Sequence, residues 1–195
     1  LKTVRSIEIE QFAPRDDTTR QHAQFTRQAY YIEPDKIGRK AFYLLRQVLE
    51  ARAHGASGVL LIVRMVPRAR LVEMLDCAAE HGLFVLLEAF DADDLAIAAS
   101  LARERAGRDE QVLMGLNCRD LETLAIDFDR FGRLRELLPP EWPAVAESGV
   151  QTPAEAANVA ALGYRLALVG TSLMRRHDAA HAVRELLEAG RMARP

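Results

Sequence analysis

The chain has 195 residues, 49% of them hydrophobic and 28% charged, which is the composition of an ordinary globular domain with a sizeable core. Its formal net charge of −2 gives no general attraction to nucleic acid, and no apolar run approaches the roughly 20 residues that cross a bilayer. The sequence therefore predicts one domain over residues 1–195, with neither a nucleic-acid nor a membrane partner.

The N-terminal residues lack a signal-peptide pattern, and the two cysteines, Cys77 and Cys118, lie far apart. Both observations predict a reducing, cytoplasmic compartment. Among the five histidines, His177 and His181 stand four apart on a predicted helix, but no third ligand lies near them in the sequence. We therefore expect no metal site.

In chain order, the first clear element is a helix over residues 35–53, where apolar residues recur at helical spacing after Pro34. A second helix is predicted over 67–81, with Leu71, Met74, Leu75 and Ala78 on one stripe. Thr152 to Glu155 form a capping box that begins a third. Strands are predicted in five apolar runs: 58–63, 83–88, 112–117, 144–147 and 166–169.

The apolar runs are continuous rather than alternating, which indicates burial on both faces and so a parallel sheet. Strand and helix alternate with a unit of about 27 residues, typical of an α/β fold. A barrel and an open doubly wound sheet both fit that alternation. Glu88, Asn117 and Glu147 each end a strand, and in a barrel such positions converge on one mouth, where active sites lie. Polar residues are also common at strand ends, where strands reach the surface. Three strands that each end in a carboxylate or an amide nevertheless favour a functional site.

Five motifs carry a family resemblance, in order and in spacing, between residues 50 and 174. They are 50–56 with 59–62, 86–88, Leu-Asn-Cys-Arg-Asp-Leu at 116–121, Glu-Ser-Gly-Val at 147–150 followed by threonine, and 168–174. Together they resemble the third helix and the fourth to eighth strands of indole-3-glycerol phosphate synthases. The resemblance implies a (β/α)8 TIM barrel.

The resemblance also implies a reaction: closure of an indole ring on 1-(2-carboxyphenylamino)-1-deoxyribulose 5-phosphate, with loss of CO2 and water, in tryptophan biosynthesis. Such a carboxy-lyase needs no cofactor, and its partner is a small phosphosugar substrate. Glu88 matches the family's acid–base residue on the fifth strand, and Glu8 matches a glutamate of the first. Asn117 and Glu147 correspond to residues that hydrogen-bond the substrate.

Arg119 and Ser148 correspond to supporting substrate contacts in the same family. The resemblance assigns phosphate binding to Gly149, Gly170 and Thr171, which follow the seventh and eighth strands. A physical reason supports this assignment, because a phosphate needs backbone N–H donors without a side chain in the way. These glycines could also simply make tight strand-to-helix turns.

The N-terminal part departs from the family pattern. Glu10 stands where the family has a functional lysine, and Ala13 where it has a serine that contacts phosphate. For the catalytic lysine of the third strand two alignments compete, one placing Gln28 at that position and the other Lys40. The helical periodicity of residues 35–53 favours the first, which makes Lys40 an ordinary solvated residue.

Too few residues separate Pro14 from either candidate third strand to hold a helix, a strand and another helix. The barrel is then either incomplete or lacks a segment near Arg15 to Arg20. A second hypothesis is therefore a divergent barrel that binds a phosphosugar but performs other chemistry, or none, as a non-catalytic subunit. A sugar-phosphate isomerase is weaker, and the oligomeric state cannot be read from the sequence.

Overall fold

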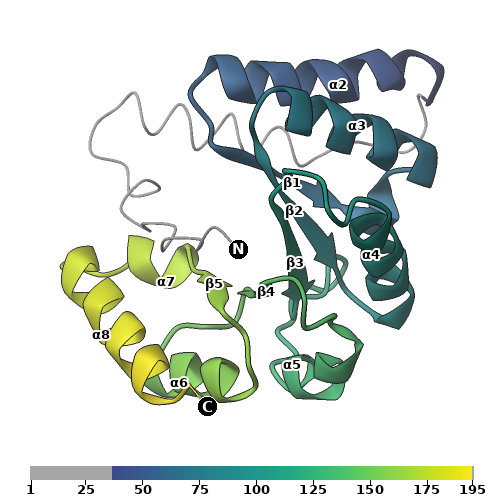
Figure 1. The fold of residues 1–195 in the computed structure, drawn as a ribbon. Coiled ribbons are helices and arrows are strands. Elements are labelled where there is room, and N and C mark those ends of the chain that lie inside the picture. Colours follow the sequence, from purple (N-terminus) through teal and green to yellow (C-terminus); the bar gives the residue numbers. More distant parts are fainter. Residues whose placement is uncertain (1–36, 195) are drawn as a thin grey trace. The chain divides into compact units, whose positions relative to one another are not determined.

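Five parallel strands form one sheet, and they stand side by side in the order of the chain (Figure 1). This computed structural model describes residues 37 to 194, with side chains from residue 44 onward. The strands are β1 (Gly58–Ile62), β2 (Phe84–Ala89), β3 (Val112–Asn117), β4 (Ala144–Glu147) and β5 (Leu166–Leu168). All five predicted strands are confirmed to within one residue at each end.

The strand order separates two of the folds that the sequence left open. Each strand pairs with the one that follows it in the chain, so the sheet contains no reversal of winding. A doubly wound sheet reverses at a switch point, whereas the wall of a barrel does not. The described residues therefore have the connectivity of a barrel wall.

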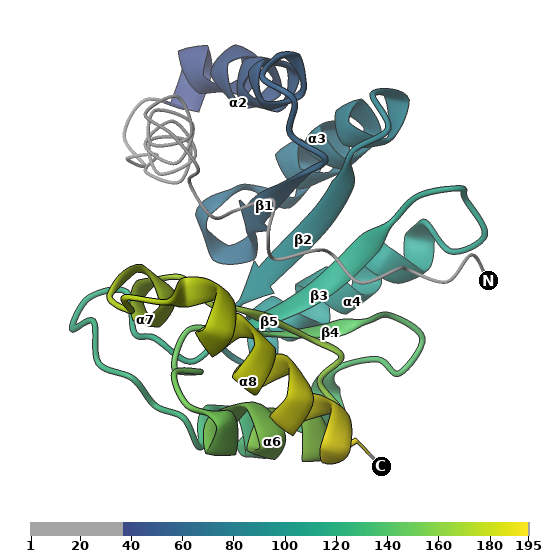
Figure 2. The same cartoon turned by 90° about the vertical axis from the view of Figure 1, so that its left-hand side faces the viewer.

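The longer helices follow one another round the outer side of the sheet (Figures 1 and 2). They are α2 (Ile37–Ala53), α3 (Arg68–Glu80), α4 (Ala92–Glu104), α6 (Pro153–Ala161) and α8 (Ala179–Met192). Short helical turns, namely η2 (Val63–Met65), α5 (Arg130–Arg133), η3 (Arg135–Leu137) and α7 (Thr171–Met174), lie in the connections. Helices α6 and α8 pack side by side.

Local sequence explains where several helices begin and end. The predicted stripe of α3 is confirmed, since Leu71, Met74, Leu75 and Ala78 are all buried. Helix α6 begins with the predicted capping box, in which the Thr152 hydroxyl accepts from the Glu155 N–H and the Glu155 carboxylate accepts from the Thr152 N–H. Helix α3 is followed by Gly82 with φ of +66°, a conformation that favours glycine and turns the chain towards β2.

The core lies between the outer face of the sheet and the helices. Leu87, Met114, Leu116 and Ala146 point to that side and are 0% exposed. Leu71, Leu75 and Leu95 meet them from α3 and α4 and are at most 1% exposed. On the inner face, Leu86, Leu113 and Val145 are also buried. Because both faces of the strands are buried, the strands read as continuous apolar runs in the sequence.

No helix within residues 37–194 is long and apolar enough to cross a membrane. In the same part of the chain, no group of three His, Cys, Asp or Glu side chains is placed to hold a metal ion. The expected common helix for His177 and His181 is wrong, because α8 begins at Ala179 and His177 lies before it. Asp178 caps the start of α8 by accepting from the His181 N–H, so the helix does not extend back to His177.

Candidate active site

The carboxyl ends of β2, β3 and β4 bring Glu88, Asn117 and Glu147 together on the inner face of the sheet. In the pairing of the strands Glu88 stands opposite Gly115, and Asn117 opposite Glu147. Opposed residues project to the same side of a parallel sheet, and so do residues two apart on one strand. The prediction that these three side chains share one end of the sheet is confirmed.

Asn117 is held by hydrogen bonds on both sides of its amide. Its Nδ2 donates to Glu88 Oε1 at 2.8 Å, and its Oδ1 accepts from the Arg119 N–H at 2.9 Å. Because a backbone N–H can only donate, the amide oxygen must face Arg119 and the NH2 group must face Glu88. Asn117 therefore orients Glu88, and its second N–H is available to a ligand.

Gly115 makes room for the carboxyl group of Glu147. A Cβ at this position would overlap Glu147 Oε1 and would lie only 3.0 Å from Leu86 Cδ1. Glu147 is 1% exposed and crosses over the glycine to reach Glu88. A glycine inside an apolar strand is a known signal of such close approach, and this signal would have identified Gly115 as part of the site.

Burial and mutual repulsion set the protonation of the two glutamates. Burial first, and then the charge of Glu88, raise the pKa of Glu147 well above its ordinary value. Burial also raises the pKa of Glu88, while hydrogen bonds from Asn117 and Glu147 oppose that shift. The two carboxyl groups therefore titrate as a coupled pair, and Glu147, the more deeply buried of the two, is the one that holds its proton more strongly.

This arrangement supplies an acid and a base within one buried cluster. Two neighbouring carboxyl groups whose environments separate their pKa values can exchange a proton with a bound substrate near neutral pH. Among the described residues, Glu147 Oε1 is a buried oxygen without a hydrogen-bond partner. The cluster has the properties of an acid–base site.

The turn after β4 contains Ser148 and Gly149, both with positive φ, of 65° and 73°. Sγ of the buried Cys118 would lie 2.7 Å from a Cβ at position 149. The positive φ and the close approach of Cys118 therefore both require a glycine at position 149, independently of any ligand. The Ser148 carbonyl accepts from the Val150 N–H at 2.9 Å, which closes a tight turn at the end of β4.

Gly170 and Thr171 follow β5 at the same end of the sheet. Gly170 has φ of −125° and caps the short helix α7, and no atom of residues 37–194 lies within 4 Å of a Cβ built on it. Thr171 is exposed. Unlike Gly149, Gly170 has neither a positive φ nor, within the described part of the chain, a neighbour that would exclude a side chain.

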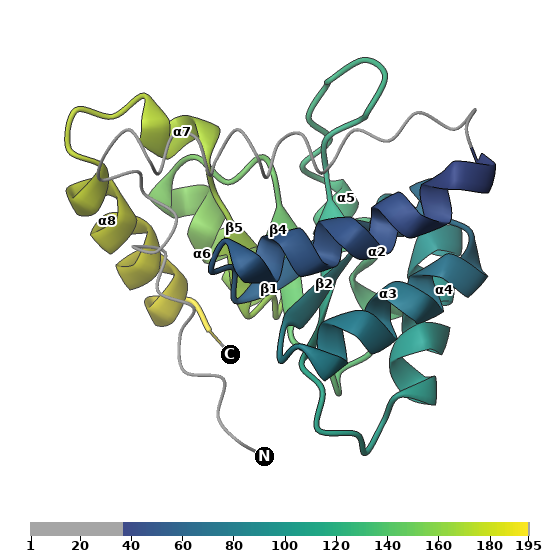
Figure 3. The same ribbon diagram turned by 90° about the horizontal axis from the view of Figure 1, so that it is seen from above.

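Arg119 begins the loop between β3 and α5, which projects beyond the neighbouring elements (Figure 3). Its Nη1 donates to the Leu124 carbonyl at 3.0 Å, and its backbone pairs with Ile126. Arg130, which sequence reasoning missed, donates to the Asn117 carbonyl at 2.9 Å. Arg119 thus braces the loop, and Arg130 braces the strand end that carries Asn117.

Other predicted site residues lie wholly or partly outside the described part of the chain. Glu8, Glu10 and Gln28 fall within residues 1–36. The backbone of Lys40 lies in α2, as the helical periodicity predicts and the alternative strand alignment does not, but its side chain is outside the described residues. The catalytic roles of Glu8 and Lys40 stay predictions.

Comparison with known proteins decides the family. Residues 21–186 match the family model of indole-3-glycerol phosphate synthase. The chain belongs to this family. A curated indole-3-glycerol phosphate synthase of Dehalococcoides mccartyi is 42% identical over 142 residues, which are 72% of this chain and 51% of the relative. Those of Azospirillum brasilense and Mycobacterium leprae are 39% and 37% identical, over 72% and 74% of this chain and 51% and 50% of the relatives.

The chain spans about half the length of the curated relatives it matches. Among solved structures, 3-hexulose-6-phosphate synthase from Salmonella typhimurium superposes with a TM-score of 0.58 at 16% identity, covering 82% of this chain and 70% of that one. The Amycolatopsis orientalis BexX/CysO complex gives 0.54 at 21% identity, covering 78% and 62%. These likenesses concern the fold alone. The family is a TIM-barrel family, and the described residues supply five consecutive strands of such a barrel.

Proposed function

We propose that the chain carries the indole-3-glycerol phosphate synthase reaction, the ring closure on 1-(2-carboxyphenylamino)-1-deoxyribulose 5-phosphate with loss of CO2 and water. The observation that carries the proposal is the buried cluster of Glu88, Asn117 and Glu147 at the carboxyl ends of three adjacent strands. Family membership and the identity of the curated relatives support it.

In this proposal Glu88 exchanges a proton with the reacting sugar carbons. Asn117 fixes the orientation of Glu88 and offers its second N–H to a substrate oxygen. Glu147 keeps its proton beside Glu88 and can donate it to a departing hydroxyl group. Arg119 and Ser148 lie at the same end of the sheet as supporting contacts.

The test is turnover by the purified chain, followed by the absorbance of the indole product. Glu88→Gln keeps the shape of the side chain and its bond from Asn117 but removes proton exchange, so turnover should fall about 10²–10⁴-fold. Glu104→Gln is the matched control, because Glu104 is an exposed surface partner of Arg68. Equal turnover of the wild type and Glu88→Gln would refute the role of Glu88.

We also propose that Gly170 and Thr171 contact the substrate phosphate, with Gly149 shaping the neighbouring turn. Gly170→Val places a branched side chain in open space, so the fold should be retained while sugar-phosphate affinity falls in calorimetry. Gly149→Val is uninformative here, because its positive φ and the contact with Cys118 destabilise any side chain. Unchanged affinity of Gly170→Val would move the phosphate site elsewhere.

A second candidate function is supported by Glu10. A carboxylate about 4 Å from the substrate carboxylate costs about 4 kcal/mol at an effective dielectric of 20, which opposes the standard reaction. A divergent phosphosugar-binding barrel would bind the substrate in calorimetry without releasing an indole product.

A further inference from the structure

Asp94 is a buried carboxylate that the proposed reaction does not use. It lies in the first turn of α4 and is 4% exposed. Its Oδ2 accepts from the Phe90 N–H at 2.9 Å and from Arg64 Nε at 2.7 Å. A carboxylate is rarely buried unless it is paired and hydrogen-bonded, so Arg64 is the group that makes this position tolerable.

Arg64 joins two neighbouring loops at the active-site end of the sheet. It lies in η2, directly after β1, whose last residue Ile62 pairs with Glu88. Its guanidinium reaches across to the β2–α4 connection, where it bonds both Asp94 and Asp91, the N-cap of α4. The same group lies over the Phe90 ring, 4.8 Å from its centre. These contacts fix the chain two residues beyond Glu88.

We propose that Arg64 and Asp94 form a positioning pair for Glu88, which anchors the end of β2 and balances a negative charge behind the catalytic carboxylate. The inference rests on the proposed function only in treating Glu88 as the reacting group. Nothing in the family resemblance assigned a role to either residue, and 30 positions separate them in the sequence.

The charges that face Glu88 define the expected effect. Asn117 from β3 donates to it, Glu147 from β4 is hydrogen-bonded to it, and Asp94 from α4 adds a negative charge. Burial is the largest cause that raises the pKa of Glu88, the hydrogen bonds from Asn117 and Glu147 come next and lower it, and the charge of Asp94 comes last and raises it. Arg64 neutralises that charge. Removing Arg64 should therefore raise the pKa of Glu88, and removing Asp94 should lower it.

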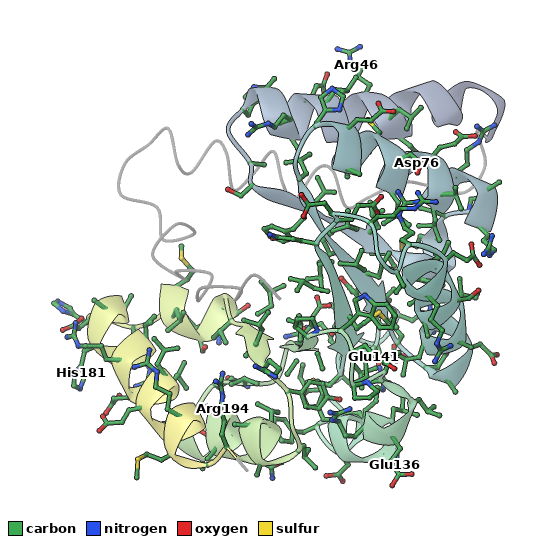
Figure 4. All side chains as sticks on the ribbon, viewed as in Figure 1. Arg46, Asp76, Glu136, Glu141, His181 and Arg194 are labelled. Carbon is green, nitrogen blue, oxygen red and sulfur yellow. The ribbon has the colours of Figure 1, made fainter. Side chains whose placement is uncertain are left out.

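The experiment is a carbon-13 NMR titration of the glutamate carboxyl groups, with Glu88 assigned by its loss in Glu88→Gln. We expect Arg64→Gln to raise the Glu88 midpoint, and Asp94→Asn to lower it, by about half a pH unit or more each. The double variant should return close to the wild type, and Arg64→Lys should lie between Arg64→Gln and the wild type. Arg46→Gln, which removes an exposed arginine on α2, should leave the midpoint unchanged (Figure 4).

Turnover provides a separate readout. The acid limb of kcat/KM against pH should move with the NMR midpoint in each variant. If the wild type shows no turnover, the proposed function fails. The titration still shows whether Arg64 and Asp94 control the protonation of Glu88. Circular dichroism checks each fold, and if Asp94→Asn does not fold, Arg64→Gln decides alone. An unchanged Glu88 midpoint in folded Arg64→Gln overturns the inference and leaves the pair as a structural bond.

Discussion

A side chain at position 115 would collide with the carboxyl group of Glu147, and this makes Gly115 a sensitive residue of the site. We expect Gly115→Ala to lower the free energy of unfolding by about 1–3 kcal/mol, the usual cost of overpacking, and to displace Glu147 from Glu88. Gly132→Ala is the matched control, because its Cβ would meet no described residue within 4 Å. Urea unfolding measures both variants, and equal stability would contradict the close approach.

Glu147 also predicts how stability depends on pH. Its pKa in the folded chain is raised well above 4.5, so the folded state binds more protons than the unfolded state above that pH. Stability from this group is therefore complete below about pH 4.5 and is lost as the pH rises towards the folded pKa. The slope reaches at most about 1.4 kcal/mol per pH unit.

Glu147→Gln should remove this slope and keep a hydrogen-bond donor towards Glu88. Urea unfolding between pH 5 and 8 compares the two proteins, and the variant should gain on the wild type as the pH rises. Glu141→Gln, which changes an exposed carboxylate before β4, accounts for the effect of losing a charge as such. Parallel pH curves for the wild type and Glu147→Gln would mean that Glu147 is already ionised.

At the scale of elements, an ion network joins α3, α4 and the approach to β3. Arg105, whose side chain is 5% exposed, bonds Glu110 at 2.5 Å and Asp76 at 2.7 Å. Asp76 is the exposed end of this network (Figure 4). Removing the arginine leaves Glu110, which is 13% exposed, without its main partner.

We expect Arg105→Met to cost about 3–5 kcal/mol of stability in chemical denaturation. Arg108→Met should cost no more than about 1 kcal/mol, because Arg108 is 53% exposed and lies 3.5 Å or more from the same carboxylates. Similar losses for both variants would show that burial does not distinguish the two arginines.

The elements themselves could largely be predicted from the sequence. Strands buried on both faces read as continuous apolar runs, and the capping box and Gly82 mark helix ends through local chemistry alone. His177 was wrongly placed on the same helix as His181, because two residues four apart in the sequence can also lie on either side of an N-cap, here Asp178. Local patterns predict that a helix exists, but they do not reveal which residue caps its start.

The candidate site could be predicted only in part. Glu88, Asn117 and Glu147 were identified because they end strands, and parallel strand ends must share one edge of the sheet. Arg64 and Asp94 were missed because their contact depends on how two loops pack across 30 residues of chain. Which of Glu88 and Glu147 holds its proton more strongly could not be predicted from the sequence, since it follows from the degree of burial of each carboxyl group.

For the whole molecule, the residues that the N-terminal part places at the family's lysine positions determine the expected turnover. Glu10 aligns with a lysine of the family, and Gln28 aligns with another in the alignment that the helical placement of the Lys40 backbone in α2 favours. With this helical placement we expect weak wild-type turnover of the anilino-deoxyribulose phosphate. Glu10→Lys combined with Gln28→Lys should raise it, because the repulsion of about 4 kcal/mol becomes a comparable attraction.

Lys40→Met tells the two alignments apart in the same assay. A loss of about 10²–10⁴-fold, the usual worth of a positioned proton donor, would assign the family's catalytic position to Lys40. Unchanged low turnover, together with a gain in the Glu10→Lys, Gln28→Lys variant, would assign that position to Gln28. Arg46→Gln controls for the loss of a positive charge from α2. Robust wild-type turnover that survives Lys40→Met would contradict both alignments, because the proton donor would then have to be a residue that neither of them names.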